Sequence, residues 1–368
     1  MNAIPLEEYV NDPSEYRRSI LDGDSFLPES ASWRFRAREM EPYMPSQAPG
    51  SPWFTVKKPL DCTADQTAAA QLLANRAEGG APLRLSPCDL YPYLRGRTLW
   101  LIGDSNTRSL FRAAQCFLLD LWEDQRVCAP STDPNLVRQL DALPLKPGTP
   151  KCIHLAGGGR VCMVHVVQGW ALANNTQVAG GGVLPLLYSN FSSPHDIVVV
   201  NFGNWHGPRA EPKSQEYVLA YKQALRLLGS FYLATVETRP HLIFHESAST
   251  HPYHPASRAC VDYPDPAAVG GGSFNKAAQE VLRDYGVPVV GDAAAFTAPA
   301  PWGHPGARAQ GGRDGVEQGD CMHFCSPGVT ELLLWTLWQA FNKGVAGIAP
   351  LPPDVGATEW GCSEMRYY

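Results

Sequence analysis

Short, uniformly apolar segments alternate with longer segments of helical periodicity through most of this chain. The apolar segments are residues 98–102, 160–167, 196–201, 241–245 and 287–290. Helical periodicity occupies about 107–122, 215–234, 275–284 and 327–342. Strands that are apolar on both faces must be covered on both sides, and intervening helices give parallel connections. The pattern predicts a three-layer α/β/α domain with a parallel sheet over residues 96–345.

The regions on either side of this domain differ from it in composition and in periodicity. Residues 1–95 are rich in proline and contain one helical stretch at 64–76, so we predict an irregular, cysteine-containing N-terminal extension that packs on the core. Residues 346–368 are predicted to form a C-terminal tail. Two segments rich in Pro, Gly and Asp, 130–150 and 299–318, are predicted to be long loops above the sheet, where active sites of such folds commonly lie.

Composition and charge exclude several classes of protein. Of 368 residues, 44% are hydrophobic and only 18% are charged, which excludes wholesale disorder. The net charge is −6 and the basic residues form no stripe, so a nucleic-acid binder that works by neutralising phosphates is excluded. No apolar run reaches the roughly 18 residues that a membrane span needs.

The cysteines predict an oxidising compartment. They number ten, lie between residues 62 and 362, and form no Cys-x-x-Cys pair. Two glycosylation sequons, at residues 174–176 and 190–192, agree with this interpretation. We therefore expect the lumen of the secretory pathway or the cell exterior. The first eight residues have no basic or apolar signal, and a cytosolic protein with buried thiols is the alternative.

A candidate nucleophile follows the first apolar segment. Residues 103–105 read Gly-Asp-Ser, and a predicted helix begins directly after them. A serine at a strand-to-helix turn projects its hydroxyl from the sheet, and the free N–H groups of the helix can stabilise developing negative charge. The alternative is an ordinary helix cap. A second Gly-Asp-Ser, at residues 23–25, has neither a strand before it nor a helix after it, so Ser25 is rejected and Ser105 retained.

A serine hydroxyl needs a base, normally a histidine that a carboxylate orients. Among ten histidines, only His323 has an aspartate, Asp320, three residues before it. This pair lies just before the last predicted helix, in a position from which the chain can return to the carboxyl ends of the strands. Asp320 would orient His323, and His323 would accept the proton of Ser105. A capping or packing role for His323 is the alternative.

The spacing of these motifs resembles a known superfamily. Residues 94–97 read Leu-Arg-Gly-Arg, 103–108 read Gly-Asp-Ser-Asn-Thr-Arg, and 320–328 read Asp-Cys-Met-His-Phe-Cys-Ser-Pro-Gly. Residues 201–205 (Asn-Phe-Gly-Asn-Trp), 247–251 and 303–305 (Gly-His-Pro) add weaker similarity. Over residues 85–345 the chain resembles the SGNH (GDSL-like) hydrolases. It is most similar to the trichome birefringence-like polysaccharide O-acetyltransferases of the PC-esterase group. Phe324 and Asn204 depart from the family's Trp and His.

The resemblance implies a flavodoxin-like α/β/α fold and a two-step acyl transfer. Ser105 would take an acetyl group from a donor, and a polysaccharide hydroxyl deprotonated by His323 would then receive it. The oxyanion would be bound by the Ser105 N–H, with the Asn201 amide and the Gly169 N–H as further candidates. Arg108, one turn beyond Ser105, could hold the oxyanion or substrate, or could pair with an acidic neighbour.

Three other interpretations remain open at this stage. Cys321 and Cys325, with His251 and His254, could bind zinc, although Cys-x-His-x-Cys is unusual spacing for that metal. The same triad could serve an esterase that hydrolyses acetylated glycans. The fold could also be a non-catalytic glycan-binding protein that stacks sugars on its tryptophans, for which the candidates are Trp170, Trp205 and Trp302.

The prediction we adopt is a lumenal (Golgi) or extracellular serine O-acetyltransferase, with the esterase as the second choice. Its partners would be an acetyl donor, as co-substrate, and a polysaccharide or oligosaccharide acceptor. We expect no metal and no dissociable organic cofactor.

Overall fold

The computed structural model describes residues 87–118, 152–173, 181–206, 215–237, 240–262, 272–291, 293–298, 300–304, 306–307, 319–324 and 329–352. Several predictions concern residues outside these ranges: the helix at 64–76, the rejected Ser25, the loop at 130–150, the first sequon and Cys325. They stay predictions.

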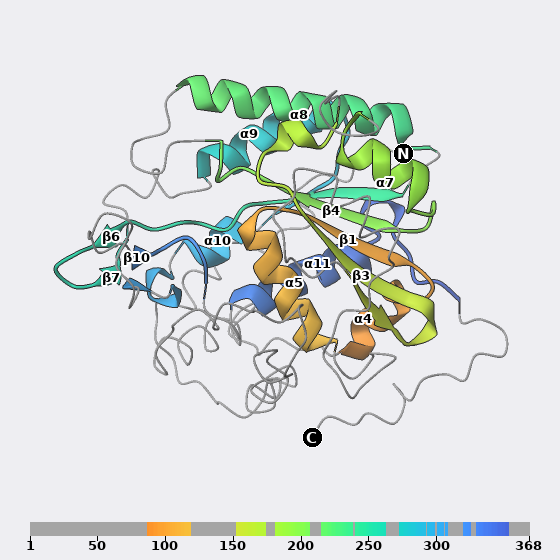
Figure 1. Ribbon diagram of the computed structural model, residues 1–368, viewed down its shortest axis with the longest axis horizontal. Coiled ribbons are helices and arrows are strands. Elements are labelled where there is room, and N and C mark those ends of the chain that lie inside the picture. Colours follow the sequence, from red (N-terminus) through yellow and green to blue (C-terminus); the bar gives the residue numbers. More distant parts are fainter. Residues whose placement is uncertain are drawn as a thin grey trace, which may run out of the picture.

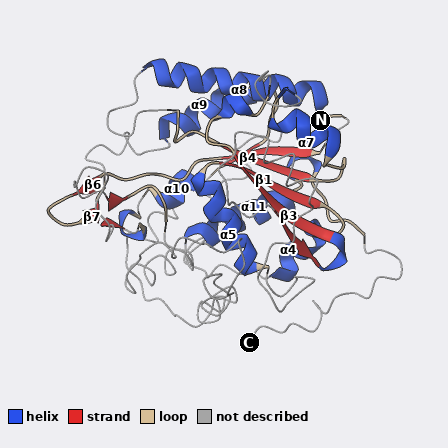
Figure 2. Ribbon diagram, viewed as in Figure 1, coloured by secondary structure: helices blue, strands red, loops and turns tan. Residues whose placement is uncertain are grey.

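A six-stranded, mostly parallel sheet forms the centre of the molecule (Figure 2). Its strand order is β2-β3-β1-β4-β5-β8. The strands are β1 (Thr98–Gly103), β2 (Cys152–Leu155), β3 (Gly159–His165), β4 (Ile197–Asn201), β5 (His241–His245) and β8 (Val289–Val290). Strands β3, β1, β4, β5 and β8 run parallel to one another, while β2 is antiparallel to β3. The mixed α/β class is therefore confirmed, with a central sheet that is mostly parallel.

Helices cover both faces of the sheet because the central strands are apolar on both faces. In β1, Leu99 and Leu101 belong to one buried cluster, and Trp100 and Ile102 belong to the other. One cluster includes residues of α4 (Pro87–Leu94), α5 (Ser105–Phe117) and α11 (Val329–Asn342). The other includes residues of α7 (Val183–Asn190), α8 (Gln215–Thr235) and α9 (Gly272–Arg283). Figure 1 shows these two groups of helices on opposite sides of the strands.

The folded core begins earlier and ends later than the predicted limits of 96 and 345. Residues 87–94, predicted as irregular, form α4, and Leu90 and Leu94 pack in the core. Beyond residue 345, Ile348 is buried, and the Leu351 carbonyl accepts a 2.7 Å hydrogen bond from Arg95 Nε. The prolines at positions 87 and 92 conceal the helix in the sequence, although Pro87 is in the first turn, where a missing N–H is tolerated.

The antiparallel strand β2 was not predicted. A single 3₁₀ turn, Ala156–Gly158, joins it to β3, and two glycines in that turn adopt positive φ, 71° at Gly157 and 70° at Gly158. Such a turn allows the chain to reverse within a few residues, so no helix intervenes. A disulfide joins Cys152 to Cys162 across this pair of strands.

Two small ribbons and two short helices lie among the loops outside the main sheet. The ribbons pair β6 (Tyr253–His254) with β7 (Ala259–Cys260) and β9 (Gly306–Ala307) with β10 (Gly319–Asp320). The helices are α10 (Ala293–Thr297) and the 3₁₀ turn Pro301–Gly303. A second disulfide joins Cys260 to Cys321. Within the ranges given above, no helix has the length and apolar character required to cross a bilayer.

Candidate active site

Ser105 is the first residue of α5 and follows the carboxyl end of β1 by two positions. The preceding residue, Asp104, is completely buried, and its Oδ1 accepts a 2.9 Å hydrogen bond from the Asn106 N–H. An aspartate in this position caps the helix and fixes the turn from strand to helix. The turn leaves the Ser105 N–H among the first N–H groups of α5, which have no acceptor within the helix.

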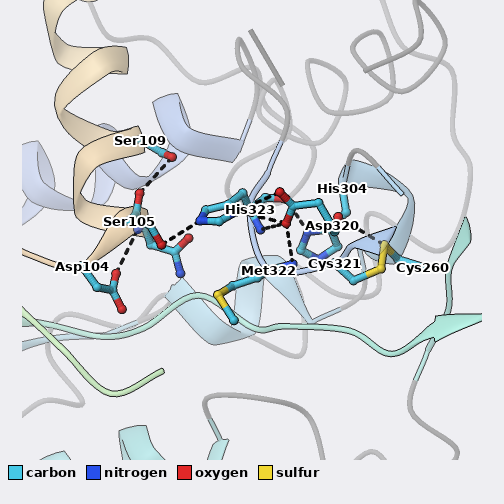
Figure 3. A network of polar contacts seen from close by, with 10 residues as sticks. Asp104, Ser105, Ser109, Cys260, His304, Asp320, Cys321, Met322 and His323 are labelled. Atoms are coloured by element: carbon cyan, nitrogen blue, oxygen red, sulfur yellow. Dashed lines mark hydrogen bonds and ion pairs between the residues drawn. A yellow bond between two sulfur atoms is a disulfide. The ribbon is translucent and has the colours of Figure 1, made fainter. Parts of the chain in front are cut away.

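His323 and Asp320 extend from Ser105 in a continuous chain of contacts (Figure 3). His323 Nε2 lies 2.7 Å from Ser105 Oγ, and His323 Nδ1 lies 3.0 Å from each Asp320 carboxylate oxygen. A hydrogen on Nδ1 that is donated to Asp320 leaves the Nε2 lone pair facing the serine hydroxyl. This is the arrangement in which a histidine can accept the serine proton.

The Asp320 carboxylate is fixed by its own loop. Its Oδ1 accepts hydrogen bonds from the N–H groups of Met322, at 3.3 Å, and His323, at 3.2 Å. The side chain of Asp320 is 3% exposed and that of His323 is 17% exposed. Asp320 is therefore held as a buried acceptor, while the His323 ring stays accessible from one side.

Three contacts hold the loop that carries His323. The Cys260–Cys321 disulfide links it to β7, and the Cys321 carbonyl accepts a 2.9 Å hydrogen bond from the His251 N–H. The His323 carbonyl lies 2.6 Å from Nδ1 of His304. None of these contacts is local in sequence, so the position of His323 depends on tertiary structure.

Burial and nearby charges shift the pKa values of Asp104 and Arg108, close to Ser105, in opposite directions. Burial raises the pKa of Asp104 to about 6, against the effects of the Asn106 N–H, His323 and Arg108. Burial also lowers the pKa of Arg108, and the attraction of Asp104 opposes this. Asp104 is thus the acidic neighbour whose charge acts on Arg108, and both roles predicted for Arg108 stay predictions.

The structure gives Asn201, a predicted oxyanion donor, a different role. Its Nδ2 donates to the His245 carbonyl at 2.8 Å and to Ser247 Oγ at 3.2 Å. Both amide hydrogens are thus engaged in joining the ends of β4 and β5. They are not directed at a substrate.

Gly169 also has a different role from the predicted one. Its N–H donates to His206 Nε2 at 2.9 Å, so it is not available to an oxyanion. Burial lowers the pKa of His206 to about 4, which keeps that nitrogen free to accept. A Cβ at position 169 would lie 2.3 Å from the Phe202 ring, so close packing explains this glycine.

Asn204 is a functional candidate that the sequence analysis did not select. Gly103 pairs with Asn201 in the parallel register of β1 and β4, so the segments that carry Ser105 and Asn204 leave the sheet side by side. The Asn204 side-chain nitrogen is buried and has no hydrogen-bond partner among the described residues. A buried amide donor without a partner is costly unless a ligand or water uses it.

The zinc alternative loses its central ligand. Cys321 is in a disulfide, so it has no thiolate to offer, and Cys325 lies outside the described residues. Within the part of the chain that the structure describes, no three His, Cys, Asp or Glu side chains gather as metal ligands.

No protein-family model matches this chain.

Proposed function

We propose that this protein is a serine-dependent O-acetyltransferase that modifies polysaccharide hydroxyls through an acetyl-serine intermediate. The observation that carries the proposal is the unbroken chain of contacts from Ser105 Oγ through His323 to Asp320. The resemblance of residues 94–108 and 320–328 to the trichome birefringence-like O-acetyltransferases adds the reaction type. An α/β sheet with the serine at the carboxyl end of a central strand is compatible with an SGNH-like fold.

In the first step, Ser105 Oγ attacks the carbonyl carbon of the acetyl donor while His323 Nε2 takes its proton. The resulting imidazolium is stabilised by Asp320 through Nδ1. Collapse of the tetrahedral intermediate breaks the bond to the leaving group, and His323 returns the proton to that group. The products of this step are acetyl-Ser105 and the protonated leaving group.

In the second step, a sugar hydroxyl occupies the place of the departed group. His323 Nε2 accepts its proton, and the sugar oxygen attacks the acetyl carbon. Ser105 Oγ leaves and regains the proton from His323. The acetyl ester has then moved to the glycan, and the enzyme has returned to its starting state without a metal or a cofactor.

The oxyanion of both intermediates would be bound by the Ser105 N–H and by the Asn204 side-chain amide. This assignment uses a buried amide nitrogen that has no partner among the described residues and lies three residues beyond the end of β4, the strand next to β1. Replacing Asn204 with Ala should lower kcat by roughly 100- to 1,000-fold, as expected when one oxyanion donor is lost. Asn201→Ala is the matched control. It should reduce stability through the lost contacts with β5 and lower kcat less.

A sugar acceptor is supported by an exposed aromatic ring close to this edge of the sheet. Trp170 is 42% exposed on the 3₁₀ turn Gly169–Ala171, which follows β3, and its indole N–H is held by the Gln168 side chain. A fixed, exposed indole can stack on the apolar face of a sugar ring. Trp170→Ala should raise the acceptor KM roughly 2- to 10-fold, and Trp170→Phe should raise it less.

Hydrolysis of glycan acetyl esters is the second candidate function. The 17% exposure of the His323 side chain favours it, because water could reach the base from the same side as an acceptor. The two reactions share every step up to acetyl-Ser105, and they differ only in which hydroxyl the enzyme admits afterwards.

We also propose that the protein works in an oxidising compartment, the Golgi lumen or the cell exterior. The Cys152–Cys162 and Cys260–Cys321 disulfides support this, and Cys88 is disulfide-bonded as well.

The decisive experiment is the detection of the acetyl-enzyme. Wild type, Ser105→Ala and Ser25→Ala are exposed to an activated acetyl ester, and intact mass and peptide mapping follow. We expect one added acetyl group on Ser105 in wild type and Ser25→Ala and none in Ser105→Ala. An adduct that persists in Ser105→Ala, or no adduct and no turnover in wild type, contradicts the proposal.

Candidate oligosaccharides then separate transfer from hydrolysis. If the acetyl group of the labelled enzyme appears on an oligosaccharide faster than as free acetate, the enzyme is a transferase. Acetate release that is indifferent to every acceptor, with hydrolysis of acetylated glycans, assigns it as an esterase.

A further inference from the structure

Two buried histidines lie directly behind the loop that carries His323. His304 is completely buried and His251 is 6% exposed. Nδ1 of His251 lies 2.7 Å from Nε2 of His304. The rings meet nearly edge to face, with centroids 4.9 Å apart. The mechanism described above uses neither residue.

The two remaining ring nitrogens each face a carbonyl oxygen. Nε2 of His251 lies 2.9 Å from the Ala298 carbonyl, and Nδ1 of His304 lies 2.6 Å from the His323 carbonyl. A carbonyl oxygen can only accept, so both of these nitrogens must carry hydrogen.

Counting hydrogens then fixes the charge of the pair. Two neutral imidazoles carry two hydrogens, and both are committed to the carbonyls. The two nitrogens between the rings would then be bare, with lone pairs facing each other at 2.7 Å. A third hydrogen on either of them converts this repulsion into a hydrogen bond.

The surroundings both oppose and support this charge. Burial lowers the pKa of each histidine, and for His304 the neighbouring His251 and His323 act in the same direction. In support, the negative charge of Asp320 raises the pKa of His304, and that of Asp262 raises the pKa of His251. The two carbonyl acceptors also favour the protonated rings. On its other side, the His304 ring packs on Phe324, with centroids 4.0 Å apart.

We propose that His251 and His304 form a singly protonated pair that shares one hydrogen and positions His323 through its backbone carbonyl. The role in positioning rests on the proposed function, whereas the shared proton does not. The pair connects the His251 loop and Ala298 to the catalytic loop. Their hydrogen bonds therefore fix the distance from His323 Nε2 to Ser105 Oγ without touching substrate.

The ring nitrogens can be counted directly by NMR. Protein labelled with ¹⁵N in its histidines is observed at pH 7 through the couplings of the ring nitrogens to carbon-bound hydrogens. His304→Asn and His251→Gln assign the signals. We expect three protonated nitrogens and one bare or hydrogen-sharing nitrogen in the pair. Two fully bare nitrogens, one on each ring, overturn the proposal whether or not the protein proves to be an enzyme.

Two replacements of His304 test the positioning role. In the His304→Asn variant the side-chain amide can replace Nδ1 as the donor to the His323 carbonyl, whereas His304→Leu removes the donor at similar volume. His304→Leu should lower kcat with the activated ester roughly 10- to 100-fold at unchanged KM, as expected for a displaced base. His304→Asn should recover most of this loss. Equal kcat values in both variants, with both folded by circular dichroism, overturn the positioning role.

Discussion

The two halves of the candidate active site are held in place by different means. Ser105 follows directly from β1, a strand buried in the centre of the sheet, and its turn is fixed by the adjacent Asp104. His323 lies on a loop whose anchors, Cys260, His251 and His304, are between 19 and 72 residues away in sequence. The nucleophile is thus placed by local structure, whereas the base is placed by tertiary cross-links.

This difference separates two ways of losing activity. Damage near Ser105 must disturb the core and should lower stability and activity together. Damage to the anchors of the His323 loop can leave the sheet intact and still move the base away from the serine. A displacement of about 1 Å is enough to cost roughly 100-fold in rate.

The largest expected effect is the loss of kcat when Ser105 or His323 is replaced, and it shows whether the two halves of the site act together. Ser105→Ala and His323→Ala should each lower kcat by about 1,000-fold or more, because neither group works without the other. The double variant should be no slower than the slower single variant, as measured with an activated acetyl ester. Multiplied losses in the double variant would show that the halves act independently.

The disulfides provide the next comparison. Replacing Cys260 and Cys321 with Ala should lower kcat roughly 10- to 100-fold, because the base is then held less well. Replacing Cys152 and Cys162 with Ala should leave kcat unchanged, since β2 lies two strands from β1. The two bridges span 61 and 10 residues, so chain entropy predicts stability losses of about 4 and about 3 kcal/mol respectively.

Thermal unfolding and kinetics measured on both pairs of variants check this prediction. If removal of either bridge lowers kcat equally, the Cys260–Cys321 bridge has no special part in placing His323. The difference between the two halves of the site would then be contradicted.

The smallest effect concerns Asp104 and the pH. Its pKa is about 6 in the folded protein and about 4 in an unfolded chain, so the folded state binds this proton more tightly. The contribution of Asp104 to the free energy of unfolding therefore decreases as the pH rises from about 4 to about 6, by roughly 2 to 3 kcal/mol. Asp104→Asn should abolish this part of the pH dependence.

Urea unfolding of wild type and Asp104→Asn at several pH values measures the difference. Asp284→Asn, at an exposed position after α9, is the control and should follow wild type. If Asp104→Asn also follows wild type between pH 4 and 6, the pKa of Asp104 is not raised in the folded protein and this prediction is wrong.

The sequence predicts the parts of the fold that depend on periodicity. The segments 98–102, 196–201 and 241–245 correspond to β1, β4 and β5 within one residue at each end. The same reasoning missed α7, which contains Pro185, and β2, whose four residues include only two strongly apolar side chains besides the disulfide cysteine. These elements form through packing and a glycine turn, which periodicity does not report.

The site was predictable to a similar degree. Ser105, His323 and Asp320 could be selected because their spacing and position suggest a chemical role. Whether an amide is free or engaged depends on neighbours far away in sequence, so Asn201 was chosen and Asn204 was not. The His251–His304 contact joins residues 53 positions apart, and no local pattern indicates it.

The arrangement of β2 bears on how the protein behaves under reducing conditions. The sheet ends in a two-residue strand at one edge and, at the other, in a strand joined to its neighbour by Cys152–Cys162. Neither edge offers a long row of free backbone groups to another chain. Without the cross-link, β2 is held to β3 by its backbone pairing alone, so we expect the β3 edge to be exposed more often under reducing conditions. We therefore expect more aggregation when the protein is produced under reducing conditions than when it is produced under oxidising ones.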